Sequence, residues 1–532
     1  MILLIVSLVA LAAISVAVFF ELRRDLMMLQ QNSYRRERYM NWLRKSGDTT
    51  STAHIIGYIL LLMGLCGLSM EIFSVSGICL FGIIRTWQLV AKKYKKPLVM
   101  TRRAMRIFVC DIILFILITG AAVALFGLGS DMQAAYAACM GAMGVFCCAH
   151  IVTLLSDLIL SPVERHINRK FYNRAAGRLA SMPGLRIIGI TGSYGKTSTK
   201  HYLHRILSEH FDTLMTPGSY NTTLGVVRTI NEYLKPYNEV FIVEMGAKQT
   251  GDIKEICDLV HPSIGIITAV GPQHLESFKT IENVRETKFE LADALPADGI
   301  AVINNDFEQS RKRNVTGRHA LRYGISAPKG CDYTAKDIRY SPDGTEFTVT
   351  GTDGTLMTLT TSLVGECNIS NLIAAVIVAL KLGVPAEKIK YAVSTIRQVE
   401  HRLSMRRLPG GITIIDDAFN SNPSGSKMAL DVLAMMPAGQ RIVITPGMIE
   451  LGEMQHELNR EFGKQISRSA DYAFIVGQYN RDAIMEGLTD GMIPDDHIFL
   501  FDNFLQANAH AMSIARPGAT ILIENDLPDT FK

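Results

Sequence analysis

The sequence lacks the signatures of several classes of protein. Its nine cysteines form no CxxC pair, which excludes a zinc ribbon and a disulfide scaffold and indicates a reducing compartment for the globular part. The 54 Lys and Arg residues are nearly balanced by 50 Asp and Glu residues, so the chain is not a general nucleic-acid binder. Six cysteines lie in apolar segments and three are scattered later in the chain: Cys66, Cys79, Cys110, Cys139, Cys147 and Cys148, then Cys257, Cys331 and Cys367.

The charge is unevenly distributed along the 532 residues. Residues 1–158 hold 15 Lys and Arg against 8 Asp and Glu, whereas residues 159–532 hold 39 against 42. The basic excess lies beside apolar runs, which is typical of a membrane boundary. The length favours roughly three or four folding units.

Four apolar runs predict a membrane region. The first, residues 2–20, has 19 residues without a charge, no basic segment before it and no small-residue cleavage site after it, so it is predicted to be an anchor and not a signal peptide. The other runs are 55–84, with Glu71 its only acidic or basic residue, 107–128, with only Asp111, and 133–155, with none apart from His150.

The basic loops predict the orientation of this region. Segments 22–53 and 92–106 each hold seven Lys or Arg residues and are therefore expected in the cytoplasm. Two cytoplasmic loops need an even number of crossings between them. Residues 55–90 are accordingly predicted to form two short helices that turn near Ser74–Gly77, giving five spans with the N-terminus outside. One long tilted helix, giving four spans, is the alternative.

Ionisable residues inside the runs allow two functional interpretations. Glu71, Asp111 and His150 suggest a transport pathway, and Cys147, Cys148 and His150 suggest a metal cluster. No run is densely polar, so packing of helices through small residues is favoured. The small residues concerned are Ala134, Ala137, Ala138, Gly141 and Gly144.

The pattern of residues in the second part of the chain predicts α/β layers. A basic juxtamembrane linker is expected at 159–184, and its Arg165, Arg169, Arg174 and Arg178 are expected to contact anionic lipid headgroups or a pyrophosphate. Short apolar strands that alternate with helices follow, which is typical of parallel sheets. Thr-rich runs between Tyr333 and Val364 predict a small antiparallel insert. A junction near Glu400–Pro409 divides two α/β domains. Strands are expected at 186–191, 241–244, 264–268, 300–303, 412–416, 441–445, 472–476, 498–501 and 520–523.

The strongest local motif is TGSYGKTS at 191–198, between a predicted strand and a predicted helix. Its glycines let backbone N–H groups approach phosphate, Lys196 reaches the β- and γ-phosphates, and Thr197 can bind Mg²⁺. The motif departs from GxxxxGK[ST], because Ile190-Thr191 stands where the first glycine is expected. A chance glycine-rich turn is the alternative.

Further motifs surround this one in a specific order. Together they resemble the Mur ligase family, the ATP-dependent amide-forming enzymes of peptidoglycan synthesis, and most of all its members that add D-alanyl-D-alanine to a UDP-linked tripeptide. The motifs are SYNTTLG (219–225), VEMGAKQTGDI (243–253), GPQHLESFKTIENVRETKFEL (271–291), GECNISNLIAA (365–375), EHRL (400–403), DDAFNSNP (416–423) and MIELGE (448–453).

The resemblance implies an architecture. The fold class is an α-helical membrane region followed by α/β domains: a P-loop central domain and a Rossmann-like C-terminal domain. The implied divisions are a transmembrane region at 1–158, the linker at 159–184, the ATP-binding domain at 185–400 and the C-terminal domain at 401–532.

The resemblance also implies a mechanism and a role for individual residues. A substrate carboxylate attacks the γ-phosphate of ATP, and an amine then attacks the acyl phosphate. Thr197 and Glu244 would hold one Mg²⁺, His274 would bind a second, and Lys288 matches a carbamylated lysine that acts as an anionic ligand. The implied catalytic residues are Lys196, Lys288, His274 and Arg402. The implied nucleotide-binding residues are Gly192, Ser193, Gly195, Lys196, Thr197, Ser198, Asn221, Asn368, Asn371, Arg402 and Asp417.

Single members of this set have plainer interpretations. Glu244 at a strand end can belong to a structural ion pair, His274 alone is an ordinary loop histidine, and Lys288 alone is a solvated helix residue. Asn368 and Asn371 are expected beside the adenine, and Arg402 and Asp417 are expected to bring the C-terminal domain onto the nucleotide. Their family positions favour the functional interpretations.

The sequence departs from the family in three places. A membrane region stands where a uridine-nucleotide-binding domain is expected, which questions the UDP-linked acceptor. The loop at 445–452 lacks an acidic residue before Met448. The last strand runs into Glu524-Asn525-Asp526 instead of a basic, glycine-containing loop. An acidic loop suits a carboxylate-bearing amine poorly, so D-alanyl-D-alanine is questioned too.

Two classes of function therefore compete. One is a membrane-anchored amide ligase that uses ATP and Mg²⁺ and joins an amino acid, dipeptide or other amine to a UDP- or lipid-linked muropeptide. Its partners would include membrane lipid but no nucleic acid, and it would lie in a bacterial plasma membrane with cytoplasmic ligase domains. The other is an ATP-driven transporter or regulator, for which the sequence lacks both polar spans and an LSGGQ motif.

The predicted topology can be tested by cysteine labelling in a cysteine-free background. Because basic loops stay in the cytoplasm, a reagent applied outside intact cells should miss cysteines at positions 40, 95 and 200 and should reach the turn at 129–131. Labelling at position 95 from outside would contradict both the orientation and the cytoplasmic ligase.

Overall fold

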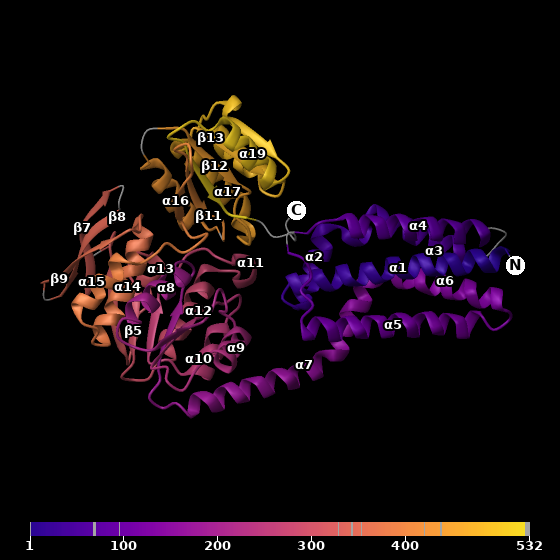
Figure 1. The fold of residues 1–532 in the computed structure, drawn as a ribbon, viewed down its shortest axis with the longest axis horizontal. Helices are drawn as coiled ribbons and strands as arrows, with labels where there is room; N and C mark the ends of the chain where they lie inside the picture. Colours follow the sequence, from indigo (N-terminus) through magenta and orange to yellow (C-terminus); the bar gives the residue numbers. More distant parts are fainter. Residues whose placement is uncertain are drawn as a thin grey trace. The chain divides into compact units, whose positions relative to one another are not determined.

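The structure is a computed structural model, and it describes residues 2–66, 71–94, 96–327, 329–341, 344–352, 354–419, 421–436 and 439–526. Within these residues the chain forms two compact units, one ending at Asn168 and one beginning at Arg169 (Figure 1). The first is helical and the second contains two β-sheets.

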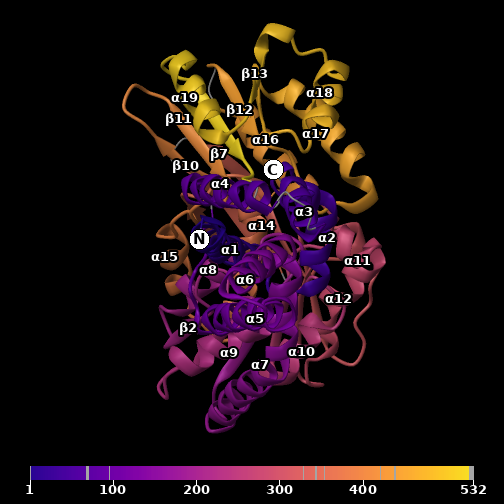
Figure 2. The same ribbon diagram turned by 90° about the vertical axis from the view of Figure 1, so that its right-hand side faces the viewer.

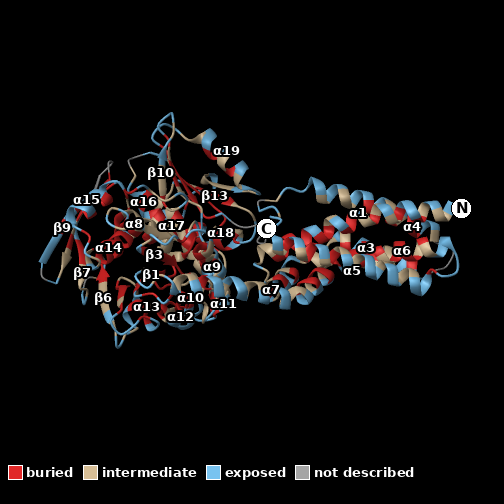
Figure 3. Ribbon diagram, turned by 60° about the horizontal axis from the view of Figure 1, so that its bottom comes forward, coloured by how far each residue is buried: buried red, intermediate tan, exposed pale blue. Residues whose placement is uncertain are grey.

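The first unit is built from apolar helices. Three of them, α1, α4 and α5, are long and apolar enough to cross a membrane; α6 and α7, bent by 78°, qualify together as a fourth. Outward-facing positions are coloured as exposed along these helices (Figure 3), and many are large and apolar, such as Ile5 and Leu8 of α1. The elements are α1 (Ile2–Gln31), α2 (Arg36–Ser46), η1 (Asp48–Thr50), α3 (Thr52–Leu65), α4 (Glu71–Ala91), α5 (Arg102–Phe126), α6 (Asp131–Cys147) and α7 (Ala149–Ala180).

The predicted pair of helices at 55–90 exists, but the predicted turn was wrong. Ser74 and Gly77 lie inside α4, and the break falls after Cys66, where 67–70 lie outside the described residues. Ser74 donates its hydroxyl to the carbonyl of Glu71 within the helix, at 3.0 Å. A Cβ on Gly77 would lie 2.9 Å from Leu60, so this glycine permits close packing of α3 and α4 and makes no turn.

The predicted segment 133–155 is not one straight helix. It breaks at Cys148, where α6 ends and α7 begins. No proline or glycine lies at 147–149 to signal the break. The α3 helix has 14 residues, about 21 Å at 1.5 Å per residue, which is short of a bilayer core of about 30 Å.

Packing through small residues is present in this unit. A Cβ on Gly82 would lie 2.8 Å from the backbone of Ala13, and one on Gly141 would lie 2.9 Å from Ala122. Gly144, which was predicted to take part, has open space around it. Among the described residues no group of three His, Cys, Asp or Glu is placed to hold a metal ion, so the metal interpretation of Cys147, Cys148 and His150 gains no support.

Charged side chains cluster where the apolar stretch of α1 ends. Glu21 is fully buried and accepts from Arg24 at 2.6 Å and from Arg85 of α4 at 2.9 Å. Asp157 is likewise paired with Arg36 and Arg103. These ionic contacts join segments far apart in the sequence.

The predicted linker at 159–184 is mostly helix. The α7 helix continues to Ala180, with Pro162 inside it. Its last turns belong to the second unit, where Ala175 is fully buried and Leu179 packs on the same apolar cluster. Arg178, which was expected at lipid headgroups, instead donates to the carbonyls of Asn231 and Leu234. The part of the segment from Arg169 onward therefore belongs to the globular unit, whereas residues 159–168 belong to the helical unit.

The larger sheet of the second unit has nine strands in the order β2-β3-β1-β4-β5-β6-β7-β8-β9. Strands β1 to β6 pair in parallel, and β7, β8 and β9 form the predicted antiparallel insert. The strands are β1 (Arg186–Thr191), β2 (Thr213–Met215), β3 (Val240–Glu244), β4 (Ile264–Ile267), β5 (Ile300–Asn304), β6 (His319–Gly324), β7 (Tyr333–Ser341), β8 (Gly344–Gly351) and β9 (Gly354–Thr361).

Helices cover this sheet on both faces, and in Figure 2 the labels of α8 and α15 lie on one side of this domain and those of α10 and α12 on the other. One apolar cluster joins α8 and α14 to the sheet, and another joins α9, α10 and α12 to it. The helices are α8 (Lys196–Leu207), α9 (Thr223–Glu232), α10 (Asp252–Val260), α11 (Leu275–Phe278), α12 (Ile281–Asp293), α13 (Glu308–Arg311), α14 (Glu366–Lys381) and α15 (Ala386–Ser394).

The smaller sheet has six strands in the order β10-β11-β15-β12-β13-β14, of which only β10 is antiparallel. Its strands are β10 (Ser404–Arg407), β11 (Thr413–Asp417), β12 (Arg441–Thr445), β13 (Tyr472–Val476), β14 (Ile498–Phe501) and β15 (Thr520–Glu524). Its helices are α16 (Pro423–Ala434), η2 (Gly452–Met454), α17 (Gln455–Ser469), α18 (Arg481–Asp490), η3 (Asp495–His497) and α19 (Phe504–Ile514).

All nine predicted strands are present within about one residue at each end, and the short β2, the polar β6 and β10 were missed. Strand β10 has the sequence SMRR, which has no apolar alternation to signal it. Both sheets place the carboxyl ends of parallel strands on one edge, where open α/β sheets bind ligands.

Candidate nucleotide and metal site

The loop between β1 and α8 requires its two glycines. Gly192 has φ 149°, and a Cβ there would lie 2.2 Å from Thr268 Oγ1. Gly195 has φ 78°, and a Cβ there would lie 2.3 Å from Asn371 Oδ1. Any side chain would therefore push the loop away from its neighbours, and the tight turn brings backbone N–H groups to the start of α8.

The same loop is braced by the segment after β4. Ser193 Oγ donates to the carbonyl of Gly271 at 2.9 Å, and the Tyr194 hydroxyl donates to the carbonyl of Pro272 at 2.8 Å. Thr268 adds a further bond from its hydroxyl to the carbonyl of Tyr194. The loop is thus held in one shape by bonds from a second strand.

Lys196 begins α8 and its Nζ donates to the carbonyls of Gly192 and Ser193, at 2.7 and 3.2 Å. Burial lowers the pKa of Lys196 to about 8, and the nearby Arg402 acts in the same direction against Glu244. The amine is therefore held over the loop, at the end of a helix that favours anions. Ser198 is buried in the first turn of the same helix.

Glu244 ends β3 and is 1% exposed. Its Oε1 accepts from Thr197 Oγ1 at 3.2 Å and from Asn221 Nδ2 at 3.1 Å. Burial alone would raise the pKa of Glu244, but Lys200 and Lys196 outweigh it and hold the pKa below the usual value. Two other predicted residues, Thr197 and Asn221, thus meet at the Glu244 carboxylate.

Sequence reasoning missed Lys200. Its fully buried Nζ lies 3.0 Å from Glu244 Oε2 and donates to the carbonyl of Gly218 at 2.6 Å. The structural ion pair that was the plainer interpretation of Glu244 is therefore present, together with the contact to Thr197. Its spacing in the sequence could have revealed this residue, because Lys200 follows Lys196 by one helical turn and therefore lies on the same face of the helix.

His274 and Lys288 lie within electrostatic reach of one another. His274 Nδ1 is in contact with the carboxylate of Glu450, which comes from the C-terminal domain and was missed as a site residue. Burial lowers the pKa of His274, and Glu450 opposes the shift. A carboxylate on one ring nitrogen orients the other toward a metal in many metal sites.

Lys288 is not a solvated helix residue. It is 1% exposed on α12, with its Nζ 5.7 Å from the centre of the Phe278 ring. Burial first, and the charge of Lys196 second, lower the pKa of Lys288 to about 7. About half of an amine with that pKa is neutral at pH 7, and the neutral form is nucleophilic.

Arg402 connects the two α/β domains. Its Nη2 donates to Thr197 Oγ1 at 3.4 Å, and its guanidinium lies 4.1 Å from the centre of the Phe419 ring. Burial raises the pKa of Asp417 to about 6, although Arg402 opposes the shift. Asp417 also accepts from the backbone N–H of Leu403, at 2.9 Å.

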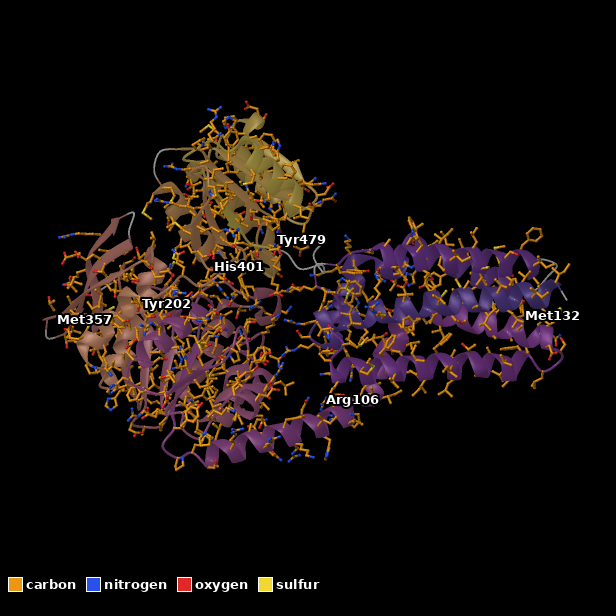
Figure 4. All side chains as sticks on the ribbon, in the orientation of Figure 1. Arg106, Met132, Tyr202, Met357, His401 and Tyr479 are labelled. Carbon is orange, nitrogen blue, oxygen red and sulfur yellow. The ribbon has the colours of Figure 1, made fainter. Side chains whose placement is uncertain are left out.

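A cavity of about 700 Å³ lies beside α8 and the segment that leads to Arg402. Tyr202, Val399 and Glu400 line it, and Figure 4 labels Tyr202 and His401 in this part of the molecule. Asn368 is nearby, but its amide is engaged: the oxygen accepts from the Tyr202 hydroxyl at 2.8 Å and the nitrogen donates to Val364. Asn371 lies against Gly195 instead.

The arrangement fits a magnesium nucleotide. Mg²⁺ is usually held by one or two protein oxygens and by substrate phosphates, and the Thr197 hydroxyl and Glu244 carboxylate offer such oxygens 3.2 Å apart at the phosphate-binding loop. Among the described residues no complete protein cage for a metal is found, in keeping with a site that phosphate completes.

Comparisons with known proteins agree with this geometry. Residues 190–379 match the Mur ligase middle domain, and residues 401–524 match the Mur ligase, glutamate ligase domain. The UDP-N-acetylmuramoyl-tripeptide–D-alanyl-D-alanine ligase of Bacillus subtilis is 29% identical over 298 residues, which are 56% of this chain and 63% of that one. The ligase of the same name from Buchnera aphidicola subsp. Acyrthosiphon pisum is 31% identical over 311 residues, 58% of this chain and 68% of that one.

A solved structure has the same fold over most of its length. The MurF ligase from Thermotoga maritima, in complex with ADP, superposes with a TM-score of 0.61 at 26% identity, over 68% of this chain and 80% of that one. The chain spans 63% and 61% of the lengths of the relatives from B. subtilis and Escherichia coli. On the two domain matches and the Buchnera relative, the chain belongs to the Mur ligase family.

Proposed function

We propose that the protein is a membrane-anchored, ATP-dependent amide ligase that acts on a peptidoglycan precursor. The observation that carries the proposal is the meeting of Lys196, Thr197, Asn221 and Glu244 at the phosphate-binding loop, with Arg402 donating to it from the C-terminal domain. A loop for phosphates and a second domain that reaches it suit a reaction in which two substrates meet at a phosphoryl group.

The reaction has two steps. An oxygen of the acceptor carboxylate bonds to the γ-phosphorus of ATP, the bond to the β-phosphate oxygen breaks, and ADP leaves. The amine nitrogen then attacks the carbonyl carbon of the acyl phosphate, phosphate leaves, and the ammonium proton passes to a base or to water. Lys196 and Arg402 offset the negative charge that collects on the transferred group.

Magnesium would be held by Thr197 and Glu244, with His274 at a second position, and would neutralise phosphate charge when bound. Lys200 keeps the Glu244 carboxylate in place. Glu450 fixes the ring of His274, so the C-terminal domain completes the site on two sides, through Glu450 and Arg402. We assign the cavity beside Tyr202 and Glu400 to the nucleoside of ATP, since it adjoins α8, the helix that follows the phosphate-binding loop.

The relatives from B. subtilis and E. coli are named as ligases of UDP-N-acetylmuramoyl-tripeptide and D-alanyl-D-alanine. By that likeness we take the acceptor to be a muropeptide, UDP-linked or lipid-linked, in a bacterium. We place the helical unit in the plasma membrane and the ligase domains in the cytoplasm, where ATP is. Outward-facing apolar side chains on α1, α4 and α5 support a lipid environment.

The proposal is tested by incubating full-length protein in detergent with ATP, Mg²⁺, muropeptide acceptors and a panel of amines, and by measuring ADP and new amides by mass spectrometry. Lys196→Ala should lower ATP turnover by more than about a hundredfold, because a charge on the phosphates is lost. The exposed Lys254→Ala should turn over as the wild type does. Unchanged turnover in Lys196→Ala would reject the nucleotide site.

We further propose that Lys288 carries a carbamate. A buried amine near Lys196 and His274 would then become an anion that binds metal or orients phosphate. Lys288→Ala should lower ligation on the order of a hundredfold, and acetate or formate should restore part of it by filling the vacated anion position. Labelling with ¹³C-bicarbonate should give a carbamate NMR signal that this variant lacks. Normal ligation by Lys288→Ala would disprove the assignment.

The part played by the helical unit is tested with a fragment that starts at Arg169. A start at Leu185 would remove Ala175 and Leu179 from the core, so the earlier start is needed. Of the two kinds of acceptor we propose the lipid-linked one, or one handed over by a membrane-bound partner. We therefore expect the fragment to bind ATP and to leave a UDP-linked tripeptide unligated. Ligation of the UDP-linked tripeptide at the full-length rate would make the helices a tether only.

A further inference from the structure

The loops that follow the parallel strands of the C-terminal sheet are acidic. Segments 416–422, 445–454, 476–480, 501–503 and 524–526 contain no lysine or arginine. They hold seven acidic residues, which are Asp416, Asp417, Glu450, Glu453, Asp502, Glu524 and Asp526. This edge of the sheet therefore carries negative charge, which attracts cations and repels carboxylates.

Two of these acids already have cationic partners. Asp416 lies 2.8 Å from His401 Nδ1, and Glu450 contacts His274 and lies 4.0 Å from Lys248. Figure 4 labels His401 and Tyr479, which belong to this edge of the domain. These ion pairs account for Asp416 and Glu450, but they do not account for Glu524.

Glu524 ends β15, the strand between β11 and β12, and is fully buried. Its Oε1 accepts from Ser421 Oγ at 2.6 Å, whereas no donor among the described residues reaches Oε2. Its partner in the register of β11 is Asp417, a second carboxylate. A buried carboxylate beside another one costs several kcal/mol unless a proton or a cation joins them.

Burial first, and the charge of Asp417 second, raise the pKa of Glu524 well above its usual value. Arg402, whose charge acts on the neighbouring Asp417, is directed elsewhere, since it donates to Thr197 and stacks on Phe419. Among the described residues, Arg402 therefore serves the nucleotide site, and no cationic side chain forms a hydrogen bond with Glu524.

An aromatic ring lies in the same loop. Phe419 is 51% exposed and two residues from Ser421, and Arg402 covers one of its faces. Carboxylates together with an aromatic face are the groups that proteins use to bind ammonium. The pair Glu524 and Asp417, with this ring nearby, thus has the chemistry of a site for an organic cation.

We propose that the amine donor of this ligase carries a second, non-reacting ammonium group, which Glu524 and Asp417 receive. The donor class is a diamine, or a basic amino acid whose carboxylate is blocked. A dipeptide with a free carboxylate would set that carboxylate against the acidic edge and would leave Glu524 without a cation. The inference rests on the proposed ligase function and names the class of its amine.

The test compares three probes on the full-length protein in detergent with ADP and Mg²⁺, by calorimetric titration. The probes are 1,5-diaminopentane, 1-aminopentane, which matches it in length and lacks the second cation, and D-alanyl-D-alanine. We expect 1,5-diaminopentane to bind at least about tenfold more tightly than 1-aminopentane, because only the diamine can form a charge-assisted hydrogen bond with its second ammonium. We expect D-alanyl-D-alanine to bind more weakly than either.

The matched variants are Glu524→Gln and Asp526→Asn, which each remove one negative charge, the first buried and the second exposed. Glutamine has the shape of a protonated Glu524 and can keep the bond to Ser421, so the fold should persist. The preference for the diamine should fall to within about twofold in Glu524→Gln, because the carboxylate oxygen that has no donor among the described residues, Oε2, is lost. The preference should stay in Asp526→Asn.

Equal binding of the two amines by the wild type would overturn the proposal without any variant. Tighter binding of D-alanyl-D-alanine, or a preference that survives in Glu524→Gln, would overturn it too. The result is separable from the ligase proposal, because amine binding is measured without turnover. Lys196→Ala is expected to lower ATP turnover and to leave the amine preference unchanged.

Discussion

The site depends on one buried carboxylate. Glu244 lies at the end of a central strand, and the side chains of Thr197 and Lys200 from α8 and of Asn221 from the loop before α9 converge on it. Removing such a charge from water is costly unless it is compensated at once, so the strand, the start of α8 and the loop before α9 have to form together. The shape of the phosphate-binding loop follows from this constraint.

How far the sequence predicted the structure depended on the kind of signal. Apolar strands such as Val240–Glu244 and Arg441–Thr445 were placed correctly, because buried parallel strands are continuous apolar runs. The residues of the phosphate loop were found because glycines and a lysine stand at a fixed spacing. Lys200 and Glu450 were missed, since one acts as a buried counter-ion and the other reaches the site from 176 residues beyond His274.

Errors arose where a residue type serves more than one purpose. Gly77 was taken for a turn and instead lets two helices approach, and the arginines of the segment 159–184 were taken for a surface and instead include Arg178, which binds main-chain carbonyls of the globular domain. A glycine can form a turn or allow two helices to pack closely, and an arginine can lie at a surface or bind main-chain carbonyls. Only the packing around the residue shows which role it has. The number of helices that cross a membrane likewise depends on how α3 and the bent pair are seated.

The ionic contacts of Glu21 bear on how the helical unit is made. Glu21 and Arg24 follow directly on the apolar stretch of α1, and one of the partners of Glu21, Arg85, is 64 residues further along the chain. A ribosome finishes α1 several seconds before it reaches α4. During that interval the carboxylate needs water or lipid headgroups around it, so α1 can settle at its final depth only once α4 has arrived. The assembly of the membrane part is therefore coupled to synthesis, and exchanging α1 for a plain apolar anchor would change the order in which the helices come together.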